Sequence, residues 1–330
     1  MRKKVFIVLV LFVCLILYLN TRIPFYRNVS GPWSLGYGFS KEYPDSISVS
    51  KNKIYSYENL NIDNDSTQFM ADPFFVKEKD TFYIFFEHKI KNIHPAKIGL
   101  LTSKDGYNYN YKGTVLKEKF HLSYPQVFKY KNEYYMIPET QAAENVLLYK
   151  AEKFPYNWKI CDTLISNIKL KDPSIFLSDT LNIIAGSDAN LTMQLYTSNS
   201  LFGDWKLHKN PNPLMGSESR PGGRFYNAKD GLILPVQNSS HGYGYGISLY
   251  KFKFNKSNYE VEKIKNLFLK RQKNIPEFNA GMHQLDIQDI DGQLYYVYDG
   301  NRLKNNDTQL NIKAVLKMNF LDFKQWLKNL

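Results

Sequence analysis

Polar side chains able to do acid–base or anion chemistry recur along the chain at nearly regular intervals. Asp72, Tyr124, Asp172 and Arg220 each stand directly before a proline, and His283 occupies a looser fifth copy, at spacings of 52, 48, 48 and 63 residues. A carboxylic acid that protonates a leaving oxygen, paired with a carboxylate that activates water or attacks, is what glycosidic-bond cleavage requires. Arginine and histidine suit an anionic group such as a phosphate or a sugar carboxylate. The pattern therefore favours sugar chemistry, provided that the fold brings these residues together.

Each copy of this pattern begins a unit that predicts four short strands. In the first unit these are residues 72–76, 82–86, 98–102 and 107–111. Runs of this length, separated by Gly, Asn, Asp and Lys turns, indicate antiparallel sheets. Four strands at a fixed period are typical of propeller blades, which bury their faces by stacking around an axis. We therefore expect an all-β, five-bladed propeller over residues 71–318, with a β-sandwich as the alternative.

In a propeller, the first residues of each innermost strand converge on the central axis. The five positions of the repeat should then surround one cavity, and the polar residues close to them in sequence should lie near it. Residues 25–70 contain no copy of the repeat and are expected to be a linker in which 33–37 closes the ring against the last blade. The third strand of that blade is expected at 310–315, and a short terminal helix at 319–330.

The first 24 residues are expected to form a short basic segment and a membrane anchor. Arg2, Lys3 and Lys4 precede an uncharged run over residues 5–19, which residues 20–23 must extend, because a spanning helix needs about 20 residues. Basic residues before the span favour a single-pass protein with a cytoplasmic N-terminus and the propeller on the non-cytoplasmic side. A cleaved signal peptide is the alternative, although no small-x-small site follows the run.

Composition excludes several other classes of protein. The chain of 330 residues has 43% apolar and 22% charged positions, which excludes a disordered tail, and 15% aromatic residues, which favours β-structure. The net charge of +12 comes without an arginine-rich stripe or zinc-finger spacing, so we expect no nucleic-acid partner. Cys14 lies in the apolar run, which leaves Cys161 without a disulfide partner. No phosphate-binding loop, dinucleotide fingerprint or metal-ligand spacing occurs, so we predict neither a cofactor nor a metal.

Five motifs occur in an order that identifies a family. They are Phe69-Met-Ala-Asp-Pro-Phe-Phe75, His121-Leu-Ser-Tyr-Pro-Gln-Val-Phe128, Met136-Ile-Pro-Glu-Thr140, Ser219-Arg-Pro-Gly-Gly-Arg224 and Gly281-Met-His-Gln-Leu-Asp286. Over about residues 32–300 the chain resembles the N-terminal domain of the glucosamine inositolphosphorylceramide transferases and its stand-alone bacterial relatives. That domain looks like the five-bladed propeller of family 43 glycoside hydrolases, in agreement with the repeat count. Plant members carry a separate C-terminal glycosyltransferase domain. The resemblance does not include that domain, so it implies nothing about the domain's chemistry for this chain.

The resemblance also implies roles for the carboxylates. Family 43 hydrolases use two aspartates and a glutamate on successive blades, and Asp72 matches the first of them, the base. The second blade offers Tyr124 at the equivalent position, so Asp172 on the third blade would have to be the second aspartate. The acid is Glu139 or Glu218. Glu139 has the better local setting, because it ends an apolar strand and would face the cavity, where desolvation raises the pKa of a carboxyl group.

Further side chains are expected to bind substrate in the same cavity. They are Glu87, His121, Tyr124, Arg220, Arg224, His283 and Asp286. The sequence therefore predicts a membrane-anchored glycosyltransferase or glycosidase-like enzyme of cell-surface glycan or glycolipid assembly, acting on a glycan, a glycolipid or a nucleotide sugar. The alternative is a non-catalytic glycan-binding propeller, or a scaffold subunit of a polysaccharide synthesis or export complex.

Overall fold

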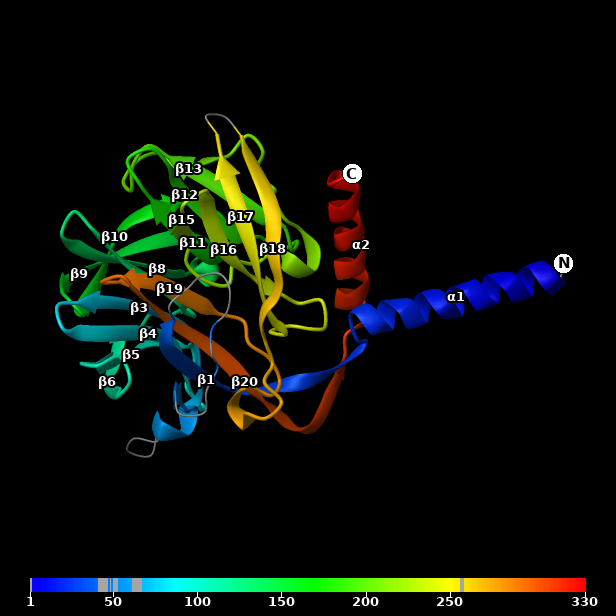
Figure 1. Ribbon diagram of the computed structural model, residues 1–330, viewed down its shortest axis with the longest axis horizontal. Coiled ribbons are helices and arrows are strands. Elements are labelled where there is room, and N and C mark those ends of the chain that lie inside the picture. The colour runs from blue at the N-terminus through cyan, green and yellow to red at the C-terminus, as the bar shows by residue number, and fades with distance from the viewer. Residues whose placement is uncertain (1, 41–46, 48, 50–52, 61–66, 256–257) are drawn as a thin grey trace.

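The protein is a five-bladed β-propeller with one helix at each end of the chain (Figure 1). The computed structural model describes residues 2–40, 47, 49, 53–60, 67–255 and 258–330. Five four-stranded antiparallel sheets form the blades, as the fifty-residue repeat predicts. The first strand of blade one contacts those of blades two and five, and the first strands of blades two and three contact each other, so these strands lie around the axis.

The first four blades follow the order of the chain from the innermost strand outward. Blade one comprises β3 (Thr67–Glu78), β4 (Thr81–Ile90), β5 (Lys97–Ser103) and β6 (Asn110–Leu116). Blade two comprises β7 (Ser123–Tyr130), β8 (Glu133–Glu139), β9 (Val146–Lys153) and β10 (Tyr156–Ile165). Blade three comprises β11 (Lys171–Leu177), β12 (Asn182–Ser187), β13 (Met193–Ser198) and β14 (Lys206–Leu207). Blade four comprises β15 (Tyr226–Ala228), β16 (Gly231–Asn238), β17 (Gly246–Phe254) and β18 (Tyr259–Lys270).

The fifth blade joins the two ends of the chain. It comprises β19 (Leu285–Ile290), β20 (Gln293–Leu310), β1 (Tyr26–Ser40) and β2 (Ile54–Tyr55). Antiparallel pairing of β1 with β20 closes the ring, as expected for residues 33–37. The strand expected at 310–315 is wrong: β1 already occupies the free edge of β20, and helix α2 (Ile312–Lys328) begins directly afterwards, seven residues before the expected start of the terminal helix.

The proline repeat encodes a β-bulge at the start of an innermost strand. Asp72, Tyr124 and Asp172 have φ angles of 52°, 49° and 50°, a conformation that residues other than glycine rarely adopt. At each of them the inner strand gains one residue relative to its neighbour. A bulge changes the direction of a side chain and is common beside active sites. The repeat therefore directs three side chains in the same way in three blades.

Apolar side chains hold the blades in place. Five clusters of buried residues each lie between two adjacent blades, one cluster for each interface of the ring. Large aromatic side chains contribute to them, as in the edge-to-face contact of Phe85 with Trp158 between blades one and two, at 5.8 Å between ring centroids. The aromatic residues that favoured β-structure in the sequence thus form much of the packing between blades.

Two helices and several short 3-10 turns complete the structure. The turns are η2 (Tyr57–Leu60), η3 (Gln141–Ala143), η4 (Gly216–Glu218) and η5 (Pro276–Phe278). Helix α1 (Arg2–Arg22) buries none of its residues and is the one helix in the described part of the chain that is long and apolar enough to cross a membrane. Helix α2 packs on η4 and meets the end of α1, where Arg22 and Asp322 form an ion pair at 2.5 Å.

Candidate active site

All five blades contribute a polar side chain to one end of the axis. Asp72 lies on β3, Glu139 ends β8, Asp172 lies on β11, Arg220 precedes β15 and His283 precedes β19. Electrostatic interactions link Asp72 with both Asp172 and His283, and link Arg220 with Glu139 and His283. The structure therefore brings these five sequence-predicted residues together.

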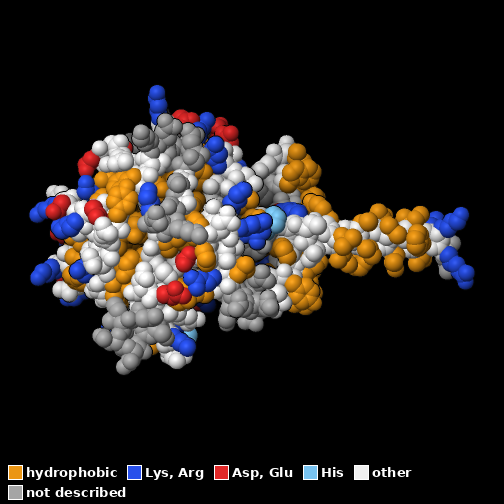
Figure 2. Space-filling view, turned by 60° about the horizontal axis from the view of Figure 1, so that its bottom comes forward, with side chains coloured by type: hydrophobic (Ala, Val, Ile, Leu, Met, Phe, Trp, Pro, Cys, Tyr) orange, Lys and Arg blue, Asp and Glu red, His pale blue; other side chains and the backbone are white. Residues whose placement is uncertain are grey.

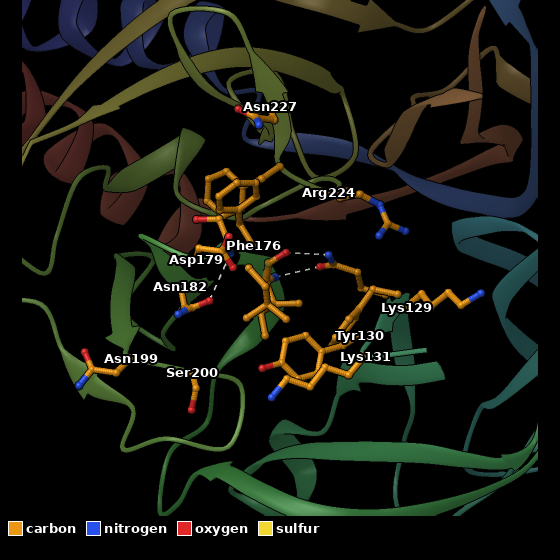
Figure 3. A pocket seen from close by; sticks show the side chains of 16 residues that line it. Lys129, Tyr130, Lys131, Phe176, Asp179, Asn182, Asn199, Ser200, Arg224 and Asn227 are labelled. Carbon is orange, nitrogen blue, oxygen red and sulfur yellow. Dashed lines mark hydrogen bonds between the residues drawn. The ribbon is translucent and has the colours of Figure 1, made fainter. Parts of the chain in front are cut away.

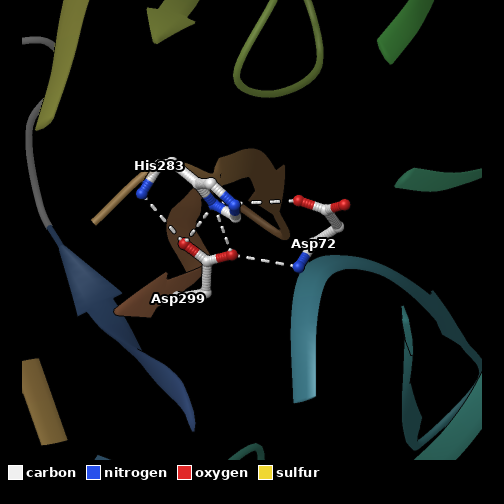
Figure 4. A group of neighbouring side chains, drawn as sticks. All are labelled: Asp72, His283 and Asp299. Atoms are coloured by element: carbon white, nitrogen blue, oxygen red, sulfur yellow. Dashed lines mark hydrogen bonds and ion pairs between the residues drawn. The ribbon is translucent and has the colours of Figure 1, made fainter. Parts of the chain in front are cut away.

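Asp299, on strand β20 of the fifth blade, contacts both Asp72 and His283 and holds them in position (Figure 4). Its carboxylate accepts hydrogen bonds from the backbone N–H groups of Asp72 (3.0 Å), His283 (3.0 Å) and Gln284 (2.9 Å). It also lies 2.8 Å from Nδ1 of His283, which is 3.8 Å from a carboxylate oxygen of Asp72. Trp33 stacks on the imidazole at 3.8 Å between ring centroids. These contacts fix both the position and the ring plane of His283.

Burial and charge shift the pKa values on this side. Burial raises the pKa of Asp72 well above its usual range, although His283 opposes the rise and Glu87 adds to it. Burial alone would lower the pKa of His283, but the Asp299 and Asp72 carboxylates together outweigh it and the pKa is raised. Both shifts favour the protonated form of the side chain concerned.

Asp72, His283 and Asp299 are also the residues that could hold a metal ion. One ligand atom from each lies within 4.8 Å of the others, and no second group of this kind occurs among the described residues. The oxygens of Asp299 already accept three backbone N–H groups and the His283 ring, however. The geometry fits a hydrogen-bonded network better than a set of free ligands.

Asp172 and Arg220 form the other side of the group. One oxygen of the buried Asp172 carboxylate accepts hydrogen bonds from Nε of Arg220 (2.7 Å) and from the amide of Gln237 (2.7 Å), and forms an ion pair with Nη2 of Arg220 at 2.6 Å. The second oxygen is buried and accepts no hydrogen bond within the described residues. The backbone N–H of Asp172 donates to Glu139 at 3.1 Å, so the bulge also positions the Glu139 carboxyl group.

Glu139 has the environment of a proton donor. Its side chain is buried, and burial together with the Asp172 carboxylate raises its pKa to about 8, against the opposing effect of Arg220 at 3.9 Å. A carboxyl group with this pKa carries a proton at pH 7, and general acids act best when their pKa lies near the working pH.

The rim of the site contains an ion pair and an aromatic ring. Glu87 contacts Nε2 of His121 at 3.1 Å, and this bond raises the pKa of His121. Tyr243, in the loop between β16 and β17, places its ring 5.6 Å from the guanidinium of Arg220 and edge-on to His283. The tyrosine is 40% exposed, so its outer side is available to a ligand.

Three predicted binding residues lie elsewhere along the axis. Tyr124 is fully buried beneath the carboxylates, and its hydroxyl bonds to Ser174 (2.7 Å) and to the N–H (2.7 Å) and carbonyl (3.0 Å) of Gly223. A Cβ on Gly223 would lie 1.8 Å from the carbonyl oxygen of Leu285, which explains the glycine at this position. These contacts seal the axis below the site.

Arg224 and Asp286, the other two, pair with each other at 2.8 Å. Arg224 also donates to the carbonyls of Phe75 (3.2 Å) and Val127 (2.9 Å), and so ties three innermost strands together. Arg224 borders a cavity of about 640 Å³ at the other end of these strands, beside Tyr130 at the end of β7 (Figure 3). Both residues make structural contacts on the side of Tyr124 that faces away from the carboxylates.

Glu218, the alternative acid, belongs to η4 beside helix α2. It accepts hydrogen bonds from Asn238 (2.8 Å) and the Tyr250 hydroxyl (2.8 Å) and pairs with Lys263. It borders a separate cavity lined by α2 residues such as Asp322. Its partners differ from those of the five central residues.

Sequence reasoning missed Asp299, Trp33 and Tyr243 as components of the site. A signal for Asp299 was present, because it directly follows the apolar run 294–298 on the second strand of its blade. Glu87 and Glu139 have the same position on the second strands of blades one and two. The chain thus contains a second repeat, of acidic residues that directly follow the apolar run of a second strand.

Comparisons with known proteins agree with this fold. A family model described as "Glucosamine inositolphosphorylceramide transferase 1, N-terminal" matches residues 43–301. A protein of Oryza sativa subsp. japonica named glucosamine inositolphosphorylceramide transferase 1 is 35% identical over an alignment of 266 residues, and the match covers 73% of this chain and 34% of the rice protein. The chain therefore spans about a third of the length of the curated relatives that it matches.

Solved structures with a similar fold are glycoside hydrolases. An exo-1,5-α-L-arabinanase from a bovine ruminal metagenomic library superposes with a TM-score of 0.51 at 16% identity, covering 73% of this chain and 90% of the arabinanase. A family 117 glycoside hydrolase from Zobellia galactanivorans has a TM-score of 0.51 at 11% identity, covering 84% and 94%. At these identities the likeness concerns the fold alone.

Proposed function

Because the chain belongs to the family of glucosamine inositolphosphorylceramide transferase N-terminal domains, we propose that it is a carbohydrate-active enzyme of cell-surface glycan or glycolipid assembly. The observation that carries this proposal is the convergence of Asp72, Glu139, Asp172, Arg220 and His283 from five blades on one end of the axis. Relatives named as transferases and the glycoside hydrolase fold support the same class of chemistry.

Glu139 and Asp72 have complementary roles in this proposal. Glu139, protonated at neutral pH because its pKa is raised to about 8, donates its proton to the oxygen of the bond that breaks. In its ionised form, Asp72 takes a proton from the incoming water or sugar hydroxyl; burial, which raises its pKa, favours the protonated form instead. His283, held by Asp299, stabilises the charged form of Asp72.

Asp172 and Arg220 position the acid and meet the substrate. Asp172 orients Glu139 through its backbone N–H and holds Arg220 by two short contacts. Arg220 uses Nε and Nη2 for Asp172 and keeps about a fifth of its side chain exposed, so it can also contact a ligand. A guanidinium here favours an anionic sugar, a nucleotide sugar or a lipid-linked phosphate as substrate.

Helix α1 supports a location at a membrane. Its composition and length suit a single span, and we propose that it is an uncleaved anchor with the propeller on the non-cytoplasmic side. An anchor would keep the site next to lipid-linked substrates.

Turnover of a panel of nucleotide sugars, glycans and glycolipids by the full chain tests the proposal. Asp72→Asn and Glu139→Gln preserve the size of each side chain and should lower kcat by about 10²- to 10⁴-fold, the usual contribution of a general acid or base. Glu218→Gln is the matched control, because Glu218 lies on η4 with separate partners. Equal activity of all three variants and the unmodified chain would contradict the catalytic roles.

A non-catalytic glycan-binding propeller is the second candidate, and one observation favours it. The Asp72, Glu139 and Asp172 side chains are each at least nine-tenths buried, which limits access to a reacting bond. This function predicts glycan binding by calorimetry without turnover of any substrate, and unchanged affinity in Glu139→Gln.

A further inference from the structure

Helix α2 has one buried side and a long apolar side that the protein leaves uncovered. Val315 and Asn319 are buried, and Asp322 reaches the backbone N–H of Ser217 in η4 at 2.7 Å. Six large apolar side chains of the helix are exposed; Ile312, Leu316, Phe320, Phe323 and Leu327 lie on the arc next to the buried one, and Trp326 lies near the C-terminal end of the helix, in line with Val315 and Asn319. The exposed fractions of the six lie between 46% and 63%. We call these six residues the apolar stripe.

The charges on α2 are arranged beside this stripe. At about 100° per residue, which follows from 3.6 residues per turn, Lys313, Lys317, Lys324 and Lys328 occupy the arc next to it. Asp322 is the single acidic residue of the helix, and it is paired with Arg22. A helix with aromatic and aliphatic side chains on one side and lysines next to them is typical of segments that lie in a membrane interface.

The stripe lies close to the point where α1 leaves the body of the protein. Arg22, at the end of α1, contacts Asp322 in α2, and α2 runs across the direction of α1 rather than alongside it (Figure 1). Tyr26 and Leu310, which pair across β1 and β20 just beyond α1, are also exposed. Hydrophobic side chains lie along α1, and others gather among polar ones at the end of the body from which it emerges (Figure 2).

We propose that α2 lies in the plane of the membrane surface, with its apolar stripe in the acyl–headgroup boundary and its lysines at the level of the phosphates. The partner is therefore a lipid bilayer that contains anionic lipid. This inference rests on the proposed span of α1, because a surface beside the exit of a spanning helix faces headgroups. The continuity of the stripe with Tyr26, Leu310 and α1 favours lipid over a second copy of the chain.

Tryptophan fluorescence of the full chain in vesicles provides the test. Trp33, Trp158 and Trp205 are buried in the propeller, and Trp326 is 55% exposed. In vesicles of phosphatidylcholine and phosphatidylglycerol, replacing the phosphatidylcholine by its chain-brominated form should quench Trp326. Because Trp326 is one of four tryptophans, up to about a quarter of the total emission should be lost. Trp326→Phe should abolish the loss.

Two further variants control for unspecific contact with the vesicle. Tyr156→Trp in the Trp326→Phe background places a reporter on β10, on the side of the body away from α1 in Figure 1, and should show no quenching. Phe320→Glu with Phe323→Glu should reduce quenching of Trp326 at least twofold.

Extraction with alkaline carbonate reports on α1 independently. Quenching of Trp326 in a chain that resists extraction supports both proposals, and quenching in an extractable chain supports the role of α2 while overturning the anchor. A chain that resists extraction without quenching overturns the role of α2 alone. An extractable chain without quenching overturns both. If copies of the chain cross-link to one another at Trp326 and brominated lipid does not quench it, the inference is also overturned.

Discussion

Replacement of Arg220 by methionine should destabilise the propeller by leaving a buried carboxylate without its partner. Asp172 is 1% exposed and receives two contacts from Arg220, at 2.6 and 2.7 Å, on one oxygen. Methionine keeps most of the length of the side chain but donates no hydrogen bond. Gln237 would then be the one remaining side-chain donor to Asp172 among the described residues.

The expected loss follows from the burial of this pair. Removing one partner of a buried ion pair costs about 3–5 kcal/mol, and the partial exposure of Arg220 favours the lower end, about 3 kcal/mol. The entropy of unfolding is about 2.1 cal/mol/K per residue, so a chain of 330 residues unfolds with about 0.7 kcal/mol/K. Arg220→Met should therefore lower Tm by about 4 °C.

Urea unfolding and thermal melts at pH 7 measure this loss, and a double variant isolates its cause. Asp172→Asn with Arg220→Met removes the unpaired charge and should recover most of the loss, leaving a deficit of about 1 kcal/mol for the missing hydrogen bonds. Equal stability of the single and double variants, or a loss below about 1 kcal/mol in the single variant, would show that the pair does not act as a buried ion pair.

Three further predictions follow from the site. Because the pKa of Glu139 is raised to about 8 in the folded protein, its contribution to stability is complete below pH 4.5 and is lost as the pH rises to about 8. Urea unfolding at pH 5, 6.5 and 8 should therefore show a smaller decline in the free energy of unfolding for Glu139→Gln than for the unmodified chain. Arg224→Met should lower the free energy of unfolding by about 3–5 kcal/mol through its buried partner Asp286, and an unchanged KM would distinguish this structural role from substrate binding. Tyr243→Ala should raise KM by about two- to tenfold, since an aromatic contact contributes about 0.5–1.5 kcal/mol. Tyr243→Phe, which keeps the ring, should leave KM unchanged, and similar KM values for both variants would exclude stacking.

The fold could be predicted because the repeat is periodic and local. The proline-containing copies of blades one to three each specify a bulge and a strand, and the spacing of all the copies indicated the number of blades. The third strand of the last blade could not be placed correctly, because that strand is β1, more than 250 residues earlier in the chain. Pairing over such a separation leaves no local pattern.

Like the fold, the candidate site could be predicted in part from the sequence. The residues before the prolines on β3 and β11 converge as expected, but equal positions in the repeat did not mean equal surroundings. Tyr124 shares the bulge of Asp72 and Asp172, yet its longer side chain reaches Gly223 and plugs the axis. Arg224 lies only four residues after Arg220, a separation of up to about 13 Å at 3.3 Å per residue, which is enough to place it beyond that plug.

The contacts of Asp322 connect the end of α1 to the segment that carries Arg220. Its carboxylate binds Arg22 and the N–H (2.7 Å) and hydroxyl (2.9 Å) of Ser217, three residues before Arg220. The carbonyl of Ser217 in turn accepts the N–H of Ser239, where the Tyr243 loop begins. A propeller attached in this way to a bilayer has little freedom to swivel. If α1 spans a bilayer as proposed, these contacts would hold the site end of the propeller at one height and tilt above the lipid.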